Sequence, residues 1–208
     1  MPKLLDRIRN WLAAGEVDAA ASGGAFLDDL FAHYPFTAQA QQWLRTAIRV
    51  EVLDRGSTVG GGTWHPDQNV VRLLTAQYEA AIHELAHAVW QGRRRERVTR
   101  DALVAAVKRL AADPDPRWAR VRTLAHHYVH GIAEEPGFEQ GMLLPEAEWG
   151  HGGGPRGEWN DWEMYAGLAS GCMADLRLLP PYLRRFYTGL FRELPPNAPA
   201  PEELAPHR

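Results

Sequence analysis

Residues 75–91 read TAQYEAAIHELAHAVWQ, and the pattern HExxH stands at their centre, in residues 83–87. The stretch contains no Pro or Gly and is rich in Ala, so it predicts a helix that ends at Gly92. Positions four apart lie one turn apart on the same face of a helix. His83 and His87 can therefore direct two imidazoles at one metal ion.

Glu84 follows the first histidine directly, where its carboxylate can reach a water held by the metal. Two ligands and a base from one helical turn are the arrangement of zinc hydrolases, which predicts Zn²⁺ as the cofactor. The composition predicts about 0.03 chance occurrences of this pattern in a shuffled chain, so context must support it. Ile82, Leu85, Ala86 and Val89 supply that context as an apolar stripe. The alternative is a histidine pair on a partly buried helix, beside a solvated glutamate.

The composition is that of an ordinary globular protein: 208 residues, 45% hydrophobic and 24% charged, suffice for one sizeable domain. A net charge of −3 gives no bulk attraction to nucleic acid. The single cysteine, Cys172, excludes an internal disulfide framework and a cysteine-rich zinc site. Residues 1–15 are amphipathic and resemble neither a signal peptide nor a membrane span, so we expect a cytoplasmic protein without a membrane partner.

The chain divides into three parts by composition. Residues 1–48 predict an N-terminal helical segment packed on the domain, 49–194 the domain that contains the motif, and 195–208 a Pro-rich disordered tail. Apolar patterns in the first part predict three helices, the last of them capped by Thr37, at residues 3–14, 26–34 and 38–48.

A small sheet is predicted directly before the motif helix. Residues 49–53 alternate and indicate a strand, whereas 62–65 and 69–74 indicate a hairpin that turns at Pro66 and Asp67. Capping residues and breakers predict four further helices downstream, at 99–112 with Thr99 as its cap, 116–130, 162–178 and 181–194. The fold class is therefore α+β, a mostly helical domain with a small β-sheet before the motif helix.

A catalytic zinc keeps three protein ligands and one open position for water. The residues after His87 read AVWQGRR, which excludes the families that place a third histidine close behind the motif. The third ligand must therefore come from further along the chain. The downstream candidates are His126, His127, His130, His151, Asp161 and Glu163.

Glu163 fits best among these candidates. It lies in the first turn of the helix predicted at 162–178, which is rich in small residues that permit a neighbouring helix to approach closely. Close approach is what a carboxylate needs in order to reach a metal held on another helix. We therefore expect His83, His87 and Glu163 to hold the metal.

His126 and His130 are the rival pair, because they too lie four apart on a predicted helix. No Glu follows His126, and histidines are common at helix C-termini, where they suit the helix dipole. His151, which is surrounded by glycines, fits better as a residue that contacts the substrate or supports the site.

At the two ligand helices the chain resembles a known family. The segments HELAHAVW (83–90) and WEMYAGLA (162–169) are similar to those of gluzincin zinc metallopeptidases, in particular the catalytic domain of anthrax lethal factor-like bacterial proteins. The resemblance covers roughly residues 49–190, and only the two helices match specifically. It implies a minimal, zincin-like metallopeptidase domain with Glu163 as third zinc ligand and a peptide or protein as substrate.

The chain departs from that family at two points. Position 167, four residues after the ligand Glu163, carries Gly where related enzymes carry an acidic residue. A Tyr or His often stabilises the oxyanion in such enzymes, yet Tyr165 should face away from the metal. His151 is therefore the candidate for that catalytic role, with Arg156 as its alternative.

These residues predict a zinc-dependent metallopeptidase in which Glu84 takes a proton from the attacking water. A strand at 62–65 or 69–73 could present a free edge to an extended peptide. The alternative function is a catalytically inactive zinc-binding domain, regulatory or interacting, that retains the HExxH site.

Overall fold

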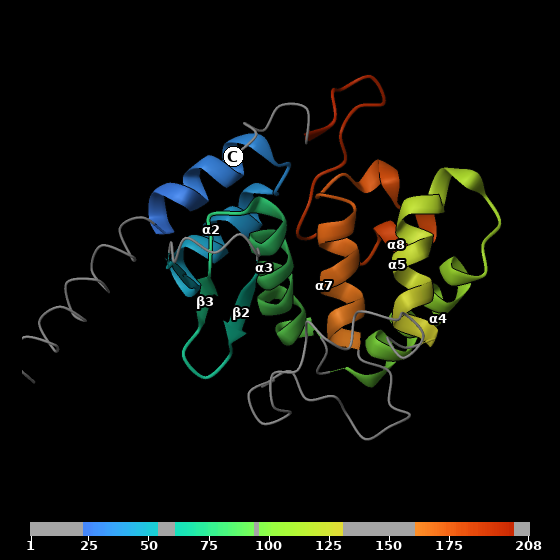
Figure 1. Ribbon diagram of the computed structural model, residues 1–208, viewed down its shortest axis with the longest axis horizontal. Helices are drawn as coiled ribbons and strands as arrows, with labels where there is room; N and C mark the ends of the chain where they lie inside the picture. Colours follow the sequence, from blue (N-terminus) through green and yellow to red (C-terminus); the bar gives the residue numbers. More distant parts are fainter. Residues whose placement is uncertain (1–22, 54–60, 94–95, 131–160, 202–208) are drawn as a thin grey trace, which may run out of the picture.

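The computed structural model describes residues 23–53, 61–93, 96–130 and 161–201 (Figure 1). Helices predominate in these ranges and three short strands form one sheet, which confirms the α+β class. Among the described helices, none combines the length and the apolar character that a membrane span requires. The helix predicted at 3–14 lies outside the described residues.

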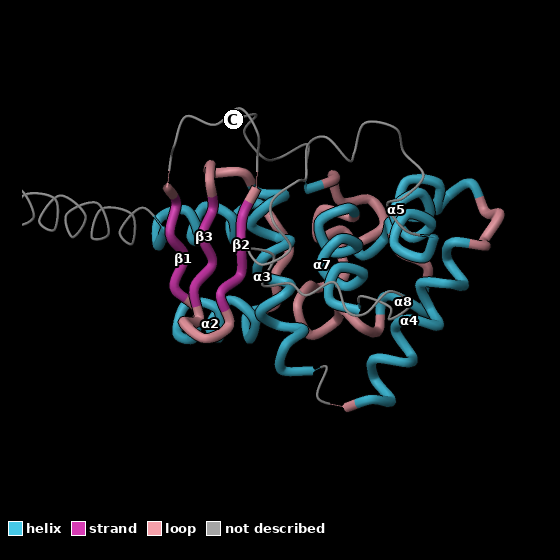
Figure 2. Tube along the Cα trace, turned by 60° about the horizontal axis from the view of Figure 1, so that its bottom comes forward, coloured by secondary structure: helices cyan, strands magenta, loops and turns pink. Residues whose placement is uncertain are grey.

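The sheet contains β1 (Arg49–Val52), β2 (Gly62–His65) and β3 (Val70–Leu73) in the order β1-β3-β2 (Figure 2). β2 and β3 form the predicted antiparallel hairpin, and β1 runs parallel to β3. β3 therefore lies at the centre with a partner on each side. Of the two strands considered for peptide binding, β3 has no free edge, and β2 is an outer strand of the described sheet.

α3 (Tyr78–Arg93) is the motif helix, and it lies between the sheet and α7 (Asp161–Gly171) (Figures 1 and 2). It begins three residues later than predicted and continues through Gly92, which therefore is not a stop signal. The guanidinium of Arg93 donates a 2.6 Å hydrogen bond to the carbonyl of Phe186, and this contact holds the last turn in place.

α4 (Arg97–Ala111), η1 (Pro116–Trp118) and α5 (Ala119–His130) lie on the side of α7 that faces away from α3 (Figure 1). The predicted cap at Thr99 is wrong, because α4 begins at Arg97 and its N-cap is Glu96. The Thr99 hydroxyl instead donates to the Glu96 carboxylate at 3.2 Å. Asp115 caps η1, since its side chain accepts from the backbone N–H of Arg117.

α7 ends at Gly171 rather than near Leu178. The N–H of Ala174 donates to the carbonyl of Ala169 at 3.2 Å, and that of Met173 to Ser170 at 2.8 Å. These two bonds are those of a Schellman motif, and Met173 adopts the positive φ of 46° that this helix ending requires.

The last predicted helix, 181–194, is also shorter than expected. η3 (Leu176–Leu178) comes before it, and α8 spans only Pro181–Arg184. Turns follow as far as residue 190, and Phe191 then forms an isolated bridge with Phe36. The bridge places the segment around Phe191 beside the segment that joins the first two described helices.

The described N-terminal helices share the core of the domain. Residues 23–33 are helical, and α2 spans Ala38–Ala47 with Thr37 as its N-cap, as predicted. Phe26 stacks on Tyr78 of α3, with ring centroids 5.7 Å apart, and the Tyr78 hydroxyl donates to Asp29 at 2.5 Å. These helices therefore support the start of the motif helix directly.

The first part of the predicted disordered tail is attached to the domain. The guanidinium of Arg177 donates to the carbonyls of Pro195, Pro196 and Ala198 at 2.9, 3.3 and 2.7 Å. Residues 202–208 lie outside the described part of the chain.

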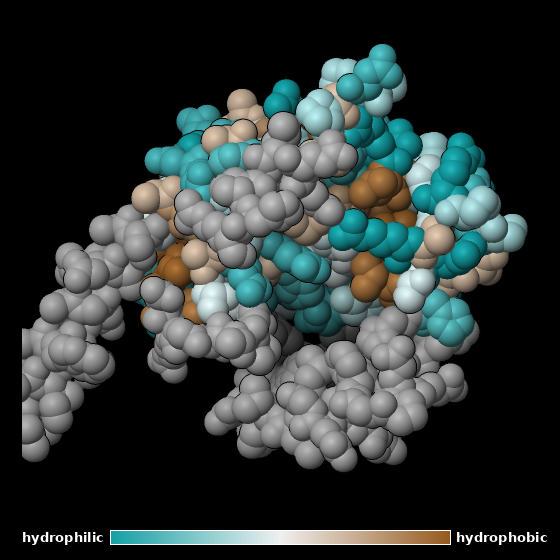
Figure 3. Space-filling view, turned by 45° about the horizontal axis from the view of Figure 1, so that its top comes forward, coloured by the Kyte–Doolittle hydropathy of each residue, from teal (hydrophilic) through white to brown (hydrophobic). Residues whose placement is uncertain are grey.

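The face in Figure 3 is mainly polar, with separate apolar areas. The exposed large apolar side chains of the described residues are scattered over different elements: Trp43 on α2, Leu74 after β3 and Val98 on α4. Single apolar side chains of this kind are normal on a protein surface.

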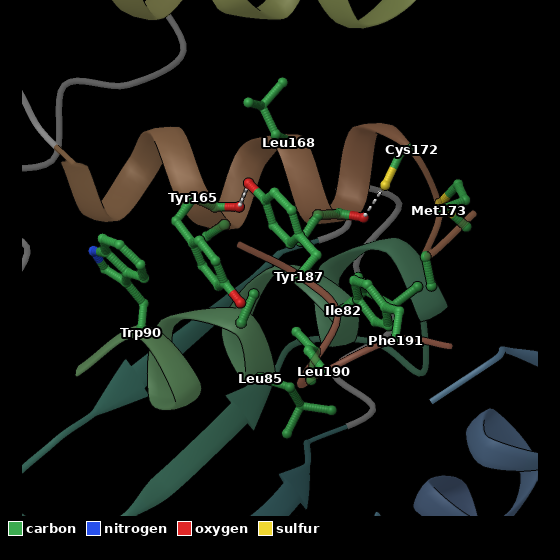
Figure 4. Close-up of a cluster of buried hydrophobic side chains, with 14 of the residues drawn as sticks. Ile82, Leu85, Trp90, Tyr165, Leu168, Cys172, Met173, Tyr187, Leu190 and Phe191 are labelled. Atoms are coloured by element: carbon green, nitrogen blue, oxygen red, sulfur yellow. Dashed lines mark hydrogen bonds between the residues drawn. The ribbon is translucent and has the colours of Figure 1, made fainter. Parts of the chain in front are cut away.

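A series of stacked aromatic rings fills the core between α3 and the C-terminal segment. Trp90 stacks on Tyr165 with centroids 4.6 Å apart, Tyr165 on Tyr187 at 4.5 Å, and Tyr187 on Phe191 at 6.5 Å (Figure 4). The Tyr165 hydroxyl donates to the carbonyl of Phe186 at 3.3 Å. Tyr165 is therefore part of the core, in agreement with the expectation that it faces away from the metal ligands.

Candidate metal centre

His83, His87 and Glu163 converge where α3 and α7 pack against each other. The Nε2 atoms of the two histidines lie 3.0 Å apart. Oε2 of Glu163 is 3.2 Å from Nε2 of His83, and its Oε1 is 3.3 Å from Nε2 of His87. Within the described ranges, these three are the only group of His, Cys, Asp and Glu side chains close enough together to hold a metal ion.

The spacing of these atoms is close to that of ligand atoms around a zinc ion, with each histidine facing its own oxygen of Glu163. Bonds of about 2.0–2.1 Å in a tetrahedral site place neighbouring ligand atoms about 3.3 Å apart. The distances of 3.0, 3.2 and 3.3 Å agree with this value within a few tenths of an ångström. Two imidazoles and one carboxylate are also the donor set of catalytic zinc sites that keep a fourth position open. The triad could therefore hold a metal ion, and its donor set is one that zinc accepts.

The three side chains differ in exposure. The side chain of His87 is 1% exposed, whereas those of His83 and Glu163 are 23% and 27% exposed. The ring of His87 lies 5.7 Å from the ring of Trp162, centroid to centroid, on α7. One side of the triad is thus enclosed between the helices, and the other is within reach of a solute.

Burial and the bonds to Glu163 act in opposite directions on the pKa values of all three residues. Burial would raise the pKa of Glu163, but hydrogen bonds from His83 and His87 outweigh it and hold that pKa well below its usual range. Burial alone would lower the pKa of His83. The bond to Glu163 and the charges of nearby carboxylates, Glu84 foremost, outweigh burial, so the pKa of His83 is raised. For His87 burial dominates and the pKa is lowered. In the metal-free triad His83 is therefore the preferred site for a proton, which a metal ion must displace.

Glu84 lies buried between α3 and β2, with 6% of its surface exposed. A Cβ added to Gly62 would lie only 2.8 Å from Cγ of Glu84 and 2.9 Å from Cδ2 of Leu73. The Glu84 side chain therefore occupies space that any side chain at position 62 would need. The glycine run at 60–62 indicated a turn, and sequence reasoning gave Gly62 no part in the site.

Gly167 explains why an acidic residue is missing four positions after Glu163. A Cβ at position 167 would overlap the Tyr128 hydroxyl, and one at Gly171 would overlap Leu124. Both contacts come from α5. The two glycines therefore make room for side chains of α5 and not for those of the motif helix.

Tyr128 is a residue near the site that sequence reasoning missed. Burial, with a further contribution from the charge of Glu163, raises the pKa of Tyr128 above its ordinary value. Its hydroxyl lies against Gly167, on the same helix as Glu163, and is protonated at neutral pH as in any tyrosine. The only signal in the sequence is indirect, namely a glycine at 167 that leaves room for a large side chain.

Asp161 and His126, whose side chains the structure describes, are not part of this group. The Asp161 carboxylate accepts a 2.6 Å hydrogen bond from Nε1 of Trp90. His126 is exposed on α5, and its pairing with His130 as a metal site stays a prediction. The side chains of the remaining candidates lie outside the described residues: His127, His130, His151 and Arg156.

A scan against protein-family models finds no matching family, and searches of the curated proteins and of the solved structures give no significant match. The functional argument therefore depends on the geometry of the triad and on the position of Glu84.

Proposed function

We propose that this chain is a zinc-dependent metallopeptidase of the gluzincin type, with a zincin-like domain. His83, His87 and Glu163 would hold the zinc ion, and Glu84 would act as general base. The observation that carries the proposal is the convergence of His83, His87 and Glu163: the two Nε2 atoms lie 3.0 Å apart, and each lies 3.2–3.3 Å from one of the two carboxylate oxygens of Glu163. Glu84, the residue that follows the first ligand, is buried, and its charge acts on His83.

Zinc in such a site supplies a water that is activated near neutral pH and a positive charge for the developing oxyanion. Glu84 accepts the proton of the attacking water and returns it to the leaving amine. Its position between α3 and β2 limits its conformational freedom, so the carboxylate is oriented before substrate arrives. The Tyr128 hydroxyl from α5 occupies the space beside Gly167, where related enzymes carry an acidic side chain.

β2 is the strand that we propose to bind the substrate. It is an outer strand of the described sheet, and its first residue, Gly62, lies against Glu84. An extended peptide that pairs with this edge would pass the general base, with its main chain held by strand addition.

Metal removal tests the proposal. The purified chain should contain about one zinc per molecule and cleave a denatured protein, because unfolded chains offer extended segments. A chelator should abolish both properties, and one equivalent of Zn²⁺ should restore them. Cleavage that persists after complete removal of zinc would contradict the proposal.

The second candidate function is a zinc-binding domain without catalysis, and the glycine at 167 favours it. It predicts stoichiometric zinc in a chain that cleaves neither denatured proteins nor peptides. The same experiment therefore separates the two functions.

Gly62→Ala should lower kcat by about tenfold to a hundredfold and leave the zinc content unchanged. The new Cβ would lie 2.8 Å from Cγ of Glu84 and must displace this side chain, whereas the ligands belong to α3 and α7. Turnover of a peptide substrate and zinc content, measured on the same sample, check this expectation.

Gly61→Ala is the matched control. A Cβ at position 61 would meet only Cδ1 of Leu74, at an ordinary distance of 3.7 Å, so activity should stay within about twofold of wild type. Equal kinetic losses in the two variants would show that the effect comes from the strand and not from Glu84.

A further inference from the structure

Three consecutive residues at the start of α7 each contact α3. The Asp161 carboxylate accepts from Nε1 of Trp90 at 2.6 Å, the ring of Trp162 lies 5.7 Å from that of His87, and Glu163 bonds to both histidines. Only in the contact of Glu163 with the histidines are both partners candidate metal ligands. The bond between Asp161 and Trp90 lies about one helical turn beyond His87 and joins the same two helices.

The bond between Trp90 and Asp161 is well suited to fix the position of α7. Trp90 is fully buried, and Asp161 is 5% exposed. The acceptor is a carboxylate, and a charged acceptor in a buried site makes a stronger bond than a neutral one. Asp161 is also the first residue of α7, where the helix dipole favours a negative charge.

The indole of Trp90 is held from two directions. Its edge donates to Asp161, and its face stacks on Tyr165, four residues later on α7, with ring centroids 4.6 Å apart and planes inclined by 16° (Figure 4). Residues four apart lie on one face of a helix, so Asp161 and Tyr165, one turn apart on α7, both contact the indole. Glu163 lies within that turn.

We infer that Trp90 and Asp161 are positioning residues that set metal affinity by holding Glu163 against the two histidines. The inference rests on the proposed metal centre and extends it to a pair that does not touch the metal. Supporting residues behind metal ligands commonly alter affinity by about 10–100-fold when they are replaced. A bond that fixes the ligand helix itself should have an effect of that order.

The experiment uses the full-length protein and two conservative variants. Asp161→Asn keeps the size of the acceptor and removes its charge, and Trp90→Phe keeps a ring on Tyr165 and removes the donor. Each should weaken Zn²⁺ binding, measured by competition with a chelator, by about tenfold. The absorption spectrum of the Co²⁺-substituted variants should also change, because it depends on coordination geometry.

The double variant tests whether the two residues act through their mutual bond. If they do, Trp90→Phe with Asp161→Asn should bind Zn²⁺ about as weakly as either single variant. Fully additive losses would mean that the two residues act independently, and the inferred role of the bond would be wrong.

Trp64→Phe is the matched control. Trp64 is 3% exposed, and its Nε1 donates to Oε1 of Gln91 at 2.8 Å, so an indole bond is also lost, here a part-buried one between β2 and α3. It should lower the thermal midpoint without changing Zn²⁺ affinity or the Co²⁺ spectrum. The inference is overturned if Trp90→Phe weakens the metal no more than Trp64→Phe does. Failure of the wild-type protein to bind Zn²⁺ or Co²⁺ would overturn the metal centre itself, and the inference with it.

Discussion

Glu84→Gln is expected to reduce peptide hydrolysis by about 10²–10⁴-fold while the protein still binds one zinc ion. The amide has almost the same shape as the carboxylate, so the packing of this side chain against Gly62 should survive. It cannot accept a proton from the attacking water, and it is not a ligand. The measurements are kcat for a peptide substrate and metal content by elemental analysis.

Glu79→Gln serves as the control for that variant. Glu79 lies on the same helix in its first turn and is exposed, and its charge also acts on His83. The control therefore removes a negative charge near the site without removing the base, and its activity should stay near that of wild type. If Glu84→Gln kept more than about a tenth of wild-type turnover, a different group would have to take the proton.

The parts of the site that could be predicted from the sequence are those that depend on local geometry. His83, Glu84 and His87 lie within five residues, so the period of one helix is sufficient to place them together. Glu163 was selected through the small residues of its helix, although the two glycines among them admit α5 instead. The structure brings the Glu163 carboxylate to both histidines, and its role as a zinc ligand stays a prediction.

Contacts between distant residues that no motif marks could not be predicted. Trp90 and Asp161 are 71 positions apart, and no local pattern distinguishes either from an ordinary core or capping residue. Gly62 approaches Glu84 only because the hairpin packs on α3, and Tyr128 approaches Gly167 only because α5 packs on α7. Each of these contacts is a consequence of how whole elements pack.

Some helix ends could be predicted from a local pattern, and others depend on tertiary packing. Thr37 and Asp115 cap their helices through side-chain bonds to backbone N–H groups two or three residues ahead, which a sequence pattern can indicate. The end of α7 has no such signal, since Met173 and Ala174 are good helix formers that here adopt positive φ. Ala174 is fully buried, which indicates that tertiary packing overrides the local preference.

Glu163→Ala is expected to weaken zinc binding by more than about 100-fold, because it removes a ligand and not merely a supporting residue. The two histidines would remain on α3, but a two-residue site lacks the carboxylate that neutralises part of the charge of the ion. Glu163→Gln should have nearly the same effect, since a neutral amide oxygen is a poor zinc ligand. Competition with a chelator measures both variants, and the thermal midpoint of the metal-free protein verifies that each is folded.

His126→Ala makes the experiment decisive between the two ligand assignments. His126 is exposed on α5, so its removal should leave both the fold and zinc affinity unchanged if Glu163 is the third ligand. The reverse outcome, with full affinity in Glu163→Ala and loss in His126→Ala, would assign the metal to the rival histidine pair.

That outcome would also leave the bonds between Glu163 and the two histidines as a purely structural ion-pair network. Such a network lowers the pKa of Glu163 and stabilises the contact between α3 and α7. This network loses stabilisation when acid protonates Glu163 and when rising pH removes the proton of His83, whose pKa is raised, so it would predict a stability that responds to pH and not to zinc. A thermal midpoint that rises on addition of Zn²⁺ in the wild type, and not in Glu163→Ala, is the result that we expect instead.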